Sequence, residues 1–269
     1  MFTLALPLVR FAVCLFAALF AATAALAQPT DLTAEIRARG ELRVCIWPDY
    51  FAISYRNPRS GALEGIDIDL AHALAARLSV RLRFVETNFA TFIDRIEAGN
   101  CDIAMMAVGI TPARAQRVDF SEPYISSPMY AVTTRTHPAI RAWGDIDQPG
   151  HVVAVAAGTV MEPIMRETLR HASMLIVPPP RTREAEVQSG RADAFMSDYP
   201  YTRRVLLAHA WARVIEPPAR FGDTPYGWAL PKNQPAWRAE VNAFLAAIRA
   251  DGSLAAAAAR HDLTPILIP

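Results

Sequence analysis

The sequence lacks an excess of charge of either sign and has almost no lysine. Lys232 is the only lysine among 27 basic residues, 26 acidic residues balance them, and the formal net charge is +1. Chains that bind nucleic acid usually carry a basic stripe or a strongly basic domain. This balance gives no electrostatic case for a nucleic-acid partner, and we expect none.

Metal-binding patterns are also absent. The chain has six histidines and three cysteines, and none of the histidines stands at a ligand spacing from another histidine or from a cysteine. We therefore expect no metal site and no cofactor. The histidines are His72, His137, His151, His171, His209 and His261.

Long hydrophobic runs are missing after residue 27, whereas residues 1–27 are almost entirely apolar. Arg10 is their only charged residue, "FAVCLFAALFAATAALA" follows it, and Ala25-Leu26-Ala27 supplies small residues at the −3 and −1 positions. This pattern predicts a secretory signal peptide that is cleaved after Ala27, and hence a soluble periplasmic product. The alternative is an uncleaved membrane anchor, for which the run is short against the ~20 residues of a span.

Two cysteines, Cys45 and Cys101, remain after this cleavage. Each lies in or beside a predicted strand, and an oxidising compartment allows them to form a disulfide. The sequence leaves open whether they meet.

Strand and helix patterns alternate through two halves of the chain, which predicts an α/β protein with two mostly parallel sheets. The 242 residues after residue 27 suit two lobes. We expect lobe 1 to comprise 28–125 and 224–269, and lobe 2 to comprise 126–223. Two extended stretches, 127–134 and 224–231, are predicted to cross between the lobes as hinges. Strands are predicted at 41–47, 80–86, 101–109, 151–158, 173–179 and 192–197, and helices at 65–78, 89–99, 160–172, 183–190, 201–211 and 235–252.

Two of these helices carry further signals. Asp67 or Asp69 is placed to cap the helix 65–78. The helix 235–252 has an apolar stripe at helical spacing, formed by Trp237, Val241, Phe244, Leu245 and Ile248.

In open α/β sheets, ligands bind beyond the carboxyl ends of the strands, so the residues at these ends are the candidates for a site. The strand 101–109 ends at Gly109, and Thr111 and Pro112 then suit the start of a helix that places Arg114 in its first turn. A cation there opposes the helix dipole, which favours a carboxylate-binding role over that of a solvated arginine.

Two strand ends of the second lobe are less specific. The strand 151–158 ends at Gly158-Thr159, which is either an anion-binding cradle or an ordinary helix start. Asp198 ends the strand 192–197 and is either a helix cap or a counter-ion for an ammonium group. Together with Arg114, these residues suit a zwitterionic α-amino acid, which needs both charges within a few ångströms. Such buried charges require pairing, which favours a cleft that closes around the ligand.

At these residues the sequence resembles the family 3 extracellular solute-binding proteins, the polar amino-acid receptors of ABC importers. The similar stretches are "GALEGIDIDLAHALAARL", "CDIAMMAVGITPARAQRVDFSEPY", "VAVAAGT", "SGRADAFMSD" and "IRADGSLAAAAARH". The resemblance implies a two-lobed type II periplasmic-binding fold and an ABC permease as partner. We also expect a monomer.

The resemblance also implies roles for individual residues. Arg114 would bind the ligand α-carboxylate with help from the backbone around Ala107 and Gly109, Thr159 would assist, and Asp198 would hold the α-amino group. Aromatic walls are implied at Tyr50, Phe51 and Phe89, although Phe51 also suits the core.

Two positions depart from the family pattern. Gly109 stands where a serine or threonine is usual, and Val160 stands where a second hydroxyl residue is common. Each lost charge-assisted hydrogen bond is worth roughly 1.5–3 kcal/mol. The ligand is therefore expected to be bound differently, or not to be a simple amino acid.

Two other functions remain as alternatives. A secreted cyclohexadienyl dehydratase-like enzyme on the same fold would need an acid over a hydroxyl leaving group. Tyr201 stands one turn beyond Asp198, where such an acid would fit, and Glu86 and Glu162 have no motif around them. A sensory receptor that presents its ligand to a membrane partner is the other alternative.

Overall fold

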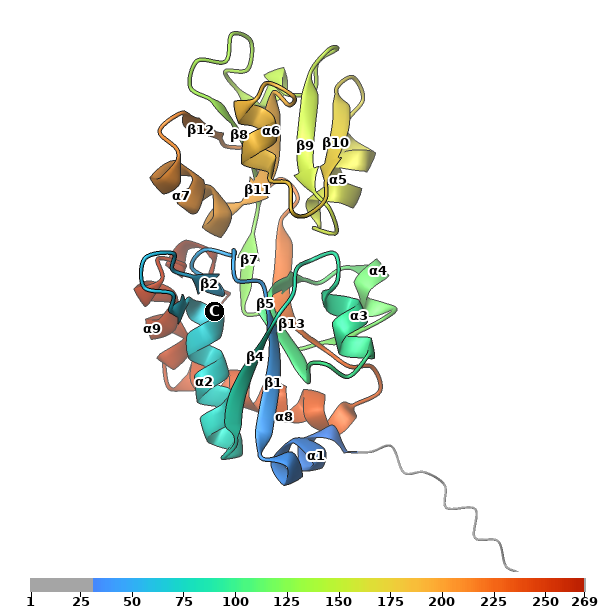
Figure 1. Cartoon of the computed structure of the whole chain (residues 1–269), viewed down its shortest axis with the longest axis vertical. Coiled ribbons are helices and arrows are strands. Elements are labelled where there is room, and N and C mark those ends of the chain that lie inside the picture. Colours follow the sequence, from blue (N-terminus) through green and yellow to red (C-terminus); the bar gives the residue numbers. More distant parts are fainter. Residues whose placement is uncertain (1–30, 269) are drawn as a thin grey trace, which may run out of the picture.

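The computed structural model describes residues 31–268, which form two lobes along the long axis of the molecule (Figure 1). The expected signal peptide lies outside the described residues, so cleavage after Ala27 stays a prediction. In Figure 1 the lower lobe combines the first and last parts of the chain, and the upper lobe holds the middle part. Within residues 31–268, no helix is both long enough and apolar enough to cross a membrane.

The lower lobe is built on a six-stranded sheet. Its strands are β1 (Glu41–Ile46), β4 (Arg81–Glu86), β5 (Ile103–Gly109), β6 (Asp119–Phe120), β7 (Ile125–Ser127) and β13 (Thr224–Leu230). The order is β4-β1-β5-β13-β6, and β7 also pairs with β13. The first three strands are parallel, whereas β13 is antiparallel to its neighbours because it enters from the upper lobe.

Helices cover both faces of this sheet, so its strands are buried on both sides. All seven residues of β5 are buried, as the sequence predicts for a strand under helices on both faces. The predicted apolar stripe of the last long helix is also confirmed, since its five residues are all buried. The other elements of this lobe are α1 (Leu32–Arg39), the hairpin β2 (Tyr55–Arg56) and β3 (Leu63–Glu64), α2 (Ile66–Leu78), α3 (Phe92–Glu97), α4 (Pro112–Ala115), α8 (Pro235–Ala250), α9 (Ser253–Arg260) and η2 (Thr264–Ile266).

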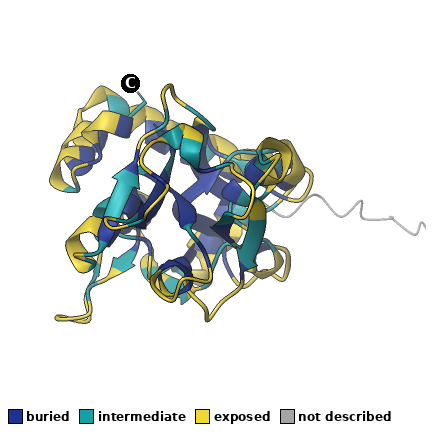
Figure 2. Ribbon diagram, turned by 90° about the horizontal axis from the view of Figure 1, so that it is seen from above, coloured by how far each residue is buried: buried dark blue, intermediate teal, exposed yellow. Residues whose placement is uncertain are grey.

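The upper lobe has a five-stranded sheet. Its strands are β8 (Met129–Thr134), β9 (Val152–Ala156), β10 (Ser173–Val177), β11 (Ala194–Asp198) and β12 (Ala212–Ile215), in the order β10-β9-β11-β8-β12. The first three strands of that order are parallel, and β8 and β12 are antiparallel to their neighbours. Its helices are η1 (Trp143–Asp145), α5 (Met161–Thr168), α6 (Arg183–Gln188) and α7 (Tyr199–Ala208). Seen from above, buried strands occupy the middle and helices expose their outer faces (Figure 2).

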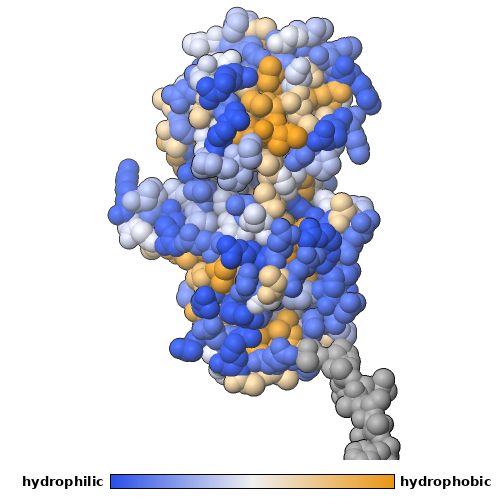
Figure 3. Space-filling model, turned by 45° about the vertical axis from the view of Figure 1, so that its right-hand side comes forward, coloured by the Kyte–Doolittle hydropathy of each residue, from blue (hydrophilic) through white to orange (hydrophobic). Residues whose placement is uncertain are grey.

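Paired strands connect the two lobes. β7 pairs with β13 from Ser127 opposite Thr224 to Ile125 opposite Tyr226, and β7 leads into β8 through Pro128. Figure 1 shows both strands running side by side into the gap between the lobes. Figure 3 shows the molecule narrowing at this height, with an apolar patch on the upper lobe.

A disulfide joins Cys45 in β1 to Cys101, which lies just before β5. Because β1 and β5 are parallel neighbours, the sheet brings the two Cα atoms to 5.6 Å although 56 residues separate them in the sequence.

The expected cap of α2 is wrong. The helix starts after Gly65, without a side-chain cap, and a Cβ at Gly65 would lie only 2.4 Å from the carbonyl oxygen of Ile53. Asp67 lies in the first turn, but it is fully buried, and its carboxylate accepts the backbone N–H of Ala107 in β5 instead of capping the helix. The elements that the sequence patterns missed include α1, the β2–β3 hairpin, β6, β7 and β12.

Candidate functional site

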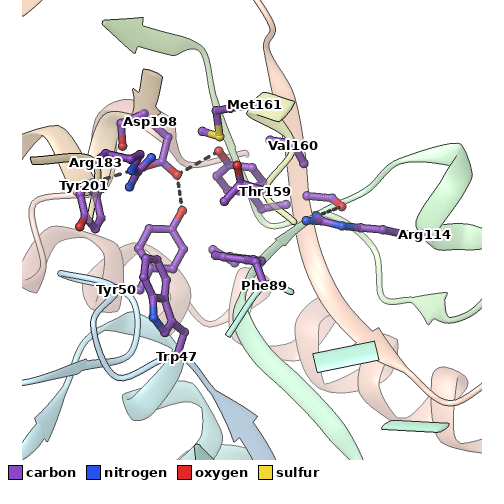
Figure 4. A pocket seen from close by; sticks show the side chains of 14 residues that line it. Trp47, Tyr50, Phe89, Arg114, Thr159, Val160, Met161, Arg183, Asp198 and Tyr201 are labelled. Carbon is purple, nitrogen blue, oxygen red and sulfur yellow. Dashed lines mark hydrogen bonds between the residues drawn. The ribbon is translucent and has the colours of Figure 1, made fainter. Parts of the chain in front are cut away.

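A cavity lies between the lobes, where strand ends of both sheets face each other (Figure 4). The space between the lining residues is about 340 Å³ when the open solvent at its mouth is included, and little of it is enclosed. The lower lobe contributes Trp47, Tyr50, Phe89, Ala107, Gly109, Arg114 and Tyr226, and the upper lobe contributes Thr159, Val160, Met161, Arg183, Ser197, Asp198 and Tyr201.

Arg114 enters this cavity from α4, directly after β5. Thr111 accepts a hydrogen bond from the backbone N–H of Arg114 at 3.3 Å, and Pro112 is the first helical residue, as the sequence predicts. Only 8% of Arg114 is exposed, and its guanidinium donates to the carbonyl oxygens of Gly109 and Gly158, both at 2.8 Å. Burial lowers the pKa of Arg114 to about 10, so the side chain stays charged at neutral pH.

The surroundings of Arg114 are aromatic and carbonyl-rich rather than anionic. Its guanidinium carbon lies 5.5 Å from the ring centroids of both Phe89 and Phe92. Among the described residues, no carboxylate oxygen lies within 4.0 Å of it. By contrast, the nearby Arg117 is half exposed and pairs with Asp94 and Glu97. Arg114 is therefore a buried cation whose charge is not neutralised by the protein.

The two departures at Gly109 and Val160 are neighbours in space. A Cβ atom at Gly109 would lie 2.5 Å from Cγ1 of Val160, closer than real atoms approach. The valine side chain therefore fills the volume that a serine or threonine at position 109 would need. Both missing hydroxyls would therefore lie in the same place, where Val160 now puts a methyl group close to the guanidinium of Arg114.

Asp198 is the helix cap that one of its two interpretations predicts, and its second carboxylate oxygen binds side chains of the other lobe. One carboxylate oxygen caps α7 by accepting the backbone N–H of Tyr201 at 3.2 Å. The other accepts the hydroxyls of Tyr50 and of Tyr226, the latter at 3.1 Å, and both tyrosines belong to the lower lobe. Asp198 is 4% exposed, and burial raises the pKa of its carboxyl group while the hydrogen bonds oppose that rise. Figure 4 shows the carboxylate turned toward Tyr50 across the cavity.

Ala107 lines the cavity, but its backbone N–H group already has an acceptor within the protein. Its backbone N–H donates to Asp67 at 2.8 Å, and Asp67 also accepts the hydroxyl of Tyr124 and the indole N–H of Trp228. Burial raises the pKa of Asp67 to about 6 in spite of these hydrogen bonds. This buried aspartate fixes the backbone at Ala107, which has a positive φ of 47°.

Of the remaining predicted residues, three line the cavity and one does not. Tyr50 and Phe89 line the cavity, and so does Thr159, whose hydroxyl donates to the carbonyl oxygen of Ala156 at 2.8 Å. Phe51 is not part of the lining; it packs against the core and lies edge-on to Tyr55. Its role as a core residue, the competing interpretation, agrees with this position.

Seven lining residues were not among the predicted site residues: Trp47, Val160, Met161, Arg183, Ser197, Tyr201 and Tyr226. Trp47 directly follows β1, and Arg183 starts the helix after β10, so the rule of strand ends would have found both. The rings of Trp47 and Tyr201 stack across the lobes, with centroids 5.9 Å apart and planes at 5°. A wider groove continues outward past Trp47, Arg183 and Tyr201.

Neither of the glutamates considered as a catalytic acid lines the cavity. Glu86 is exposed and pairs with Arg56, and Glu162 accepts the backbone N–H of Gly158 at 3.2 Å. Asp198 is the one carboxyl group in the lining. Within residues 31–268, no group of three or more His, Cys, Asp or Glu is arranged to hold a metal ion.

Comparison with known proteins gives consistent matches over most of the chain. The model of the bacterial extracellular solute-binding proteins, family 3, matches residues 42–262. A cyclohexadienyl dehydratase of Pseudomonas aeruginosa is 30% identical over 228 residues, which cover 84% of each chain. The ABC transporter glutamine-binding protein GlnH of Bacillus subtilis is 28% identical over 82% of this chain and 81% of its own length.

A solved structure supports the same assignment. The ancestral amino acid-binding protein AncCDT-1, described as a precursor of cyclohexadienyl dehydratase, is 32% identical and superposes with a TM-score of 0.76. The match covers 85% of this chain and 98% of that one. The predicted two-lobed type II periplasmic-binding fold is thereby confirmed.

Proposed function

Because the chain belongs to the bacterial extracellular solute-binding proteins, family 3, we propose that it is a periplasmic receptor that captures an amino acid or similar zwitterion between its lobes and delivers it to an ABC importer. One observation carries this proposal: Arg114 from the lower lobe and Asp198 from the upper lobe line the same cavity. Neither has a partner of opposite charge within 4.0 Å among the described residues.

The charges explain why ligand binding and lobe closure would be coupled. An α-carboxylate can replace the carbonyl oxygens at Arg114, and an α-ammonium group can take a place at Asp198 beside Tyr50 and Tyr226. In each case a buried charge that has no ion-pair partner in the protein gains one from the ligand. A ligand that carries both groups therefore bridges the lobes, as expected of a hinge-bending receptor.

The test is a titration of amino acids into the purified protein and its Arg114→Ala variant. We expect a loss of affinity of at least 100-fold, because the α-carboxylate loses its buried guanidinium partner. The melting temperature without ligand should change little, since the loss of two hydrogen bonds is offset by the removal of an unneutralised buried charge.

The matched control is Arg117→Ala, which removes an exposed arginine three residues away that pairs with Asp94 and Glu97. It should leave the affinity unchanged. If Arg114→Ala binds amino acids as the wild type does, or if no amino acid binds the wild type, the proposal fails.

A second candidate function rests on Asp198. Its carboxyl group has a raised pKa, as a general acid requires, and one relative is a cyclohexadienyl dehydratase. The experiment is incubation of the purified protein with prephenate or arogenate while aromatic product is followed by absorbance. Product that disappears in Asp198→Asn would establish the enzyme, whereas no product would leave the receptor function alone.

A further inference from the structure

A second buried arginine, Arg183, faces the same cavity as Arg114. It is 5% exposed and begins α6 in the upper lobe. In Figure 4 its guanidinium lies between Asp198 and Tyr201, on the side of the cavity away from Arg114. The proposed roles of Arg114 and Asp198 leave this residue without a function.

The contacts of Arg183 hold it in place without an ion pair, although its charge lowers the pKa of the nearby Asp198 carboxyl group against the effect of burial. Nη1 donates to the carbonyl oxygen of Met196 at 2.7 Å. The guanidinium carbon lies 4.4 Å from the ring centroid of Tyr201 and 5.3 Å from that of Phe195. Among the described residues no carboxylate oxygen lies within 4.0 Å of it, and its other N–H groups make no hydrogen bond with them.

Four other arginines form ion pairs with buried carboxylates, unlike Arg183. Arg39 and Arg43 both bind the carboxylate of Asp102, and Arg181 and Arg191 both bind that of Glu186. Arg183 differs from all four, because its guanidinium is supported by a carbonyl oxygen and two aromatic rings only.

The lining of the cavity therefore holds two cations and one carboxylate. Glu184, the neighbour of Arg183 in sequence, is also buried, but it lines the outer groove and not the cavity. In a neutral zwitterion, the carboxylate would pair with Arg114 and the ammonium group with Asp198. Arg183 would then have no ion-pair partner. One further negative charge on the ligand completes the balance.

We propose that Arg183 binds an anionic group on the ligand side chain, so that the substrate class is amino acids with a short acidic side chain. This inference rests on the proposed function. A guanidinium suits a carboxylate, because its N–H groups can bind both carboxylate oxygens, and the small enclosed part of the cavity suits a short side chain. A cationic side chain would instead meet a like charge in a poorly screened site.

The test compares ligands that differ in side-chain charge, by calorimetric titration of the full mature protein. L-glutamate and L-aspartate are compared with their amides, L-glutamine and L-asparagine, and with L-arginine. We expect at least one acid to bind roughly 10- to 100-fold more tightly than its amide, as a charge-assisted hydrogen bond predicts. This comparison uses the wild type only and so does not depend on how a variant folds.

A variant then assigns the preference to the residue. Arg183→Gln should reduce the ratio of acid to amide affinity to about one and leave binding of the amide within a few-fold. Arg191→Gln is the matched control, because it removes an exposed arginine of the same lobe that pairs with Glu186 and lines neither cavity nor groove. It should leave the ratio unchanged.

Each outcome separates the inference from the function on which it rests. Equal or tighter binding of the amides or of L-arginine would overturn the inference and leave the receptor proposal standing. Binding of no amino acid would overturn the receptor proposal. Glutarate binding as tightly as glutamate would support Arg183 as an anion site but overturn the role of Asp198 toward an ammonium group.

Discussion

Asp67 and Asp198 are both buried carboxylates that receive hydrogen bonds from aromatic side chains and from one backbone N–H, but they join different parts of the molecule. The donors to Asp67 are Tyr124, Trp228 and the backbone of Ala107, which all belong to the lower lobe. Asp198 receives a backbone N–H from its own lobe and two tyrosine hydroxyls from the other.

The difference predicts a structural role for Asp67 and a ligand-binding role for Asp198. All donors to Asp67 belong to the lower lobe, so these hydrogen bonds do not depend on the contact between the lobes. Those that Asp198 accepts from Tyr50 and Tyr226 depend on the contact between lobes, and a ligand can replace them. Substitutions at Asp67 should therefore change the stability of a lobe, and those at Asp198 should change closure and affinity.

The largest effect is expected for Asp67→Ala. The substitution leaves three buried donors without an acceptor, and each costs on the order of 1–3 kcal/mol. We expect the free energy of unfolding to fall by about 3 kcal/mol or more, measured by urea denaturation.

Asp69→Ala is the matched control on the same helix. Asp69 is partly exposed and binds Arg260 and His261 at the surface, so its loss should cost less than about 1 kcal/mol. If the two variants lose equal free energy of unfolding, the buried hydrogen bonds of Asp67 do not stabilise the lower lobe more than a surface ion pair does.

A second effect concerns pH. Burial raises the pKa of Asp67 to about 6, above its ordinary value of 3.8, so the folded state binds a proton that the unfolded state releases. The stabilisation from this proton is fully present below pH 3.8 and is lost as the pH rises through about 6. Relative to Asp67→Asn, which cannot titrate, the wild type should lose on the order of 3 kcal/mol across this range.

Urea unfolding of both proteins at several pH values measures this difference. A constant difference between pH 4 and pH 7 would show that Asp67 is ionised throughout, contrary to the expected effect of its burial.

The sequence predicted most of the strands and helices and half of the residues that line the cavity. What made each residue predictable differs. Arg114 was found because Thr111 and Pro112 define the helix start that carries it, which is a local signal. The apolar stripe of α8 was found for the same reason, since its period is visible within one helix.

The misses depend on contacts between distant segments. Asp67 was assigned to a helix cap because its sequence neighbours allow one, whereas its partners lie 40, 57 and 161 residues away. Gly109 and Val160 were noted as separate departures, and only the structure places them against each other. Arg183 lies at a strand end, but no local pattern indicated that its charge would lack a partner.

The smallest effect is expected from a matched pair of hydroxyl deletions. Tyr124→Phe removes one donor from Asp67, and Tyr226→Phe removes one donor from Asp198. We expect Tyr124→Phe to lower the free energy of unfolding by about 1–2 kcal/mol, because the hydroxyl bonds a buried carboxylate inside one lobe. Tyr226→Phe should cost less than about 0.5 kcal/mol, since Asp198 keeps Tyr50 and the N–H of Tyr201 and can regain water when the lobes part. Urea denaturation of both variants gives the two values side by side. If Tyr226→Phe destabilises the protein as much as Tyr124→Phe does, then the contact between the lobes is as permanent as the core of the lower lobe, and Asp198 is a structural acid like Asp67.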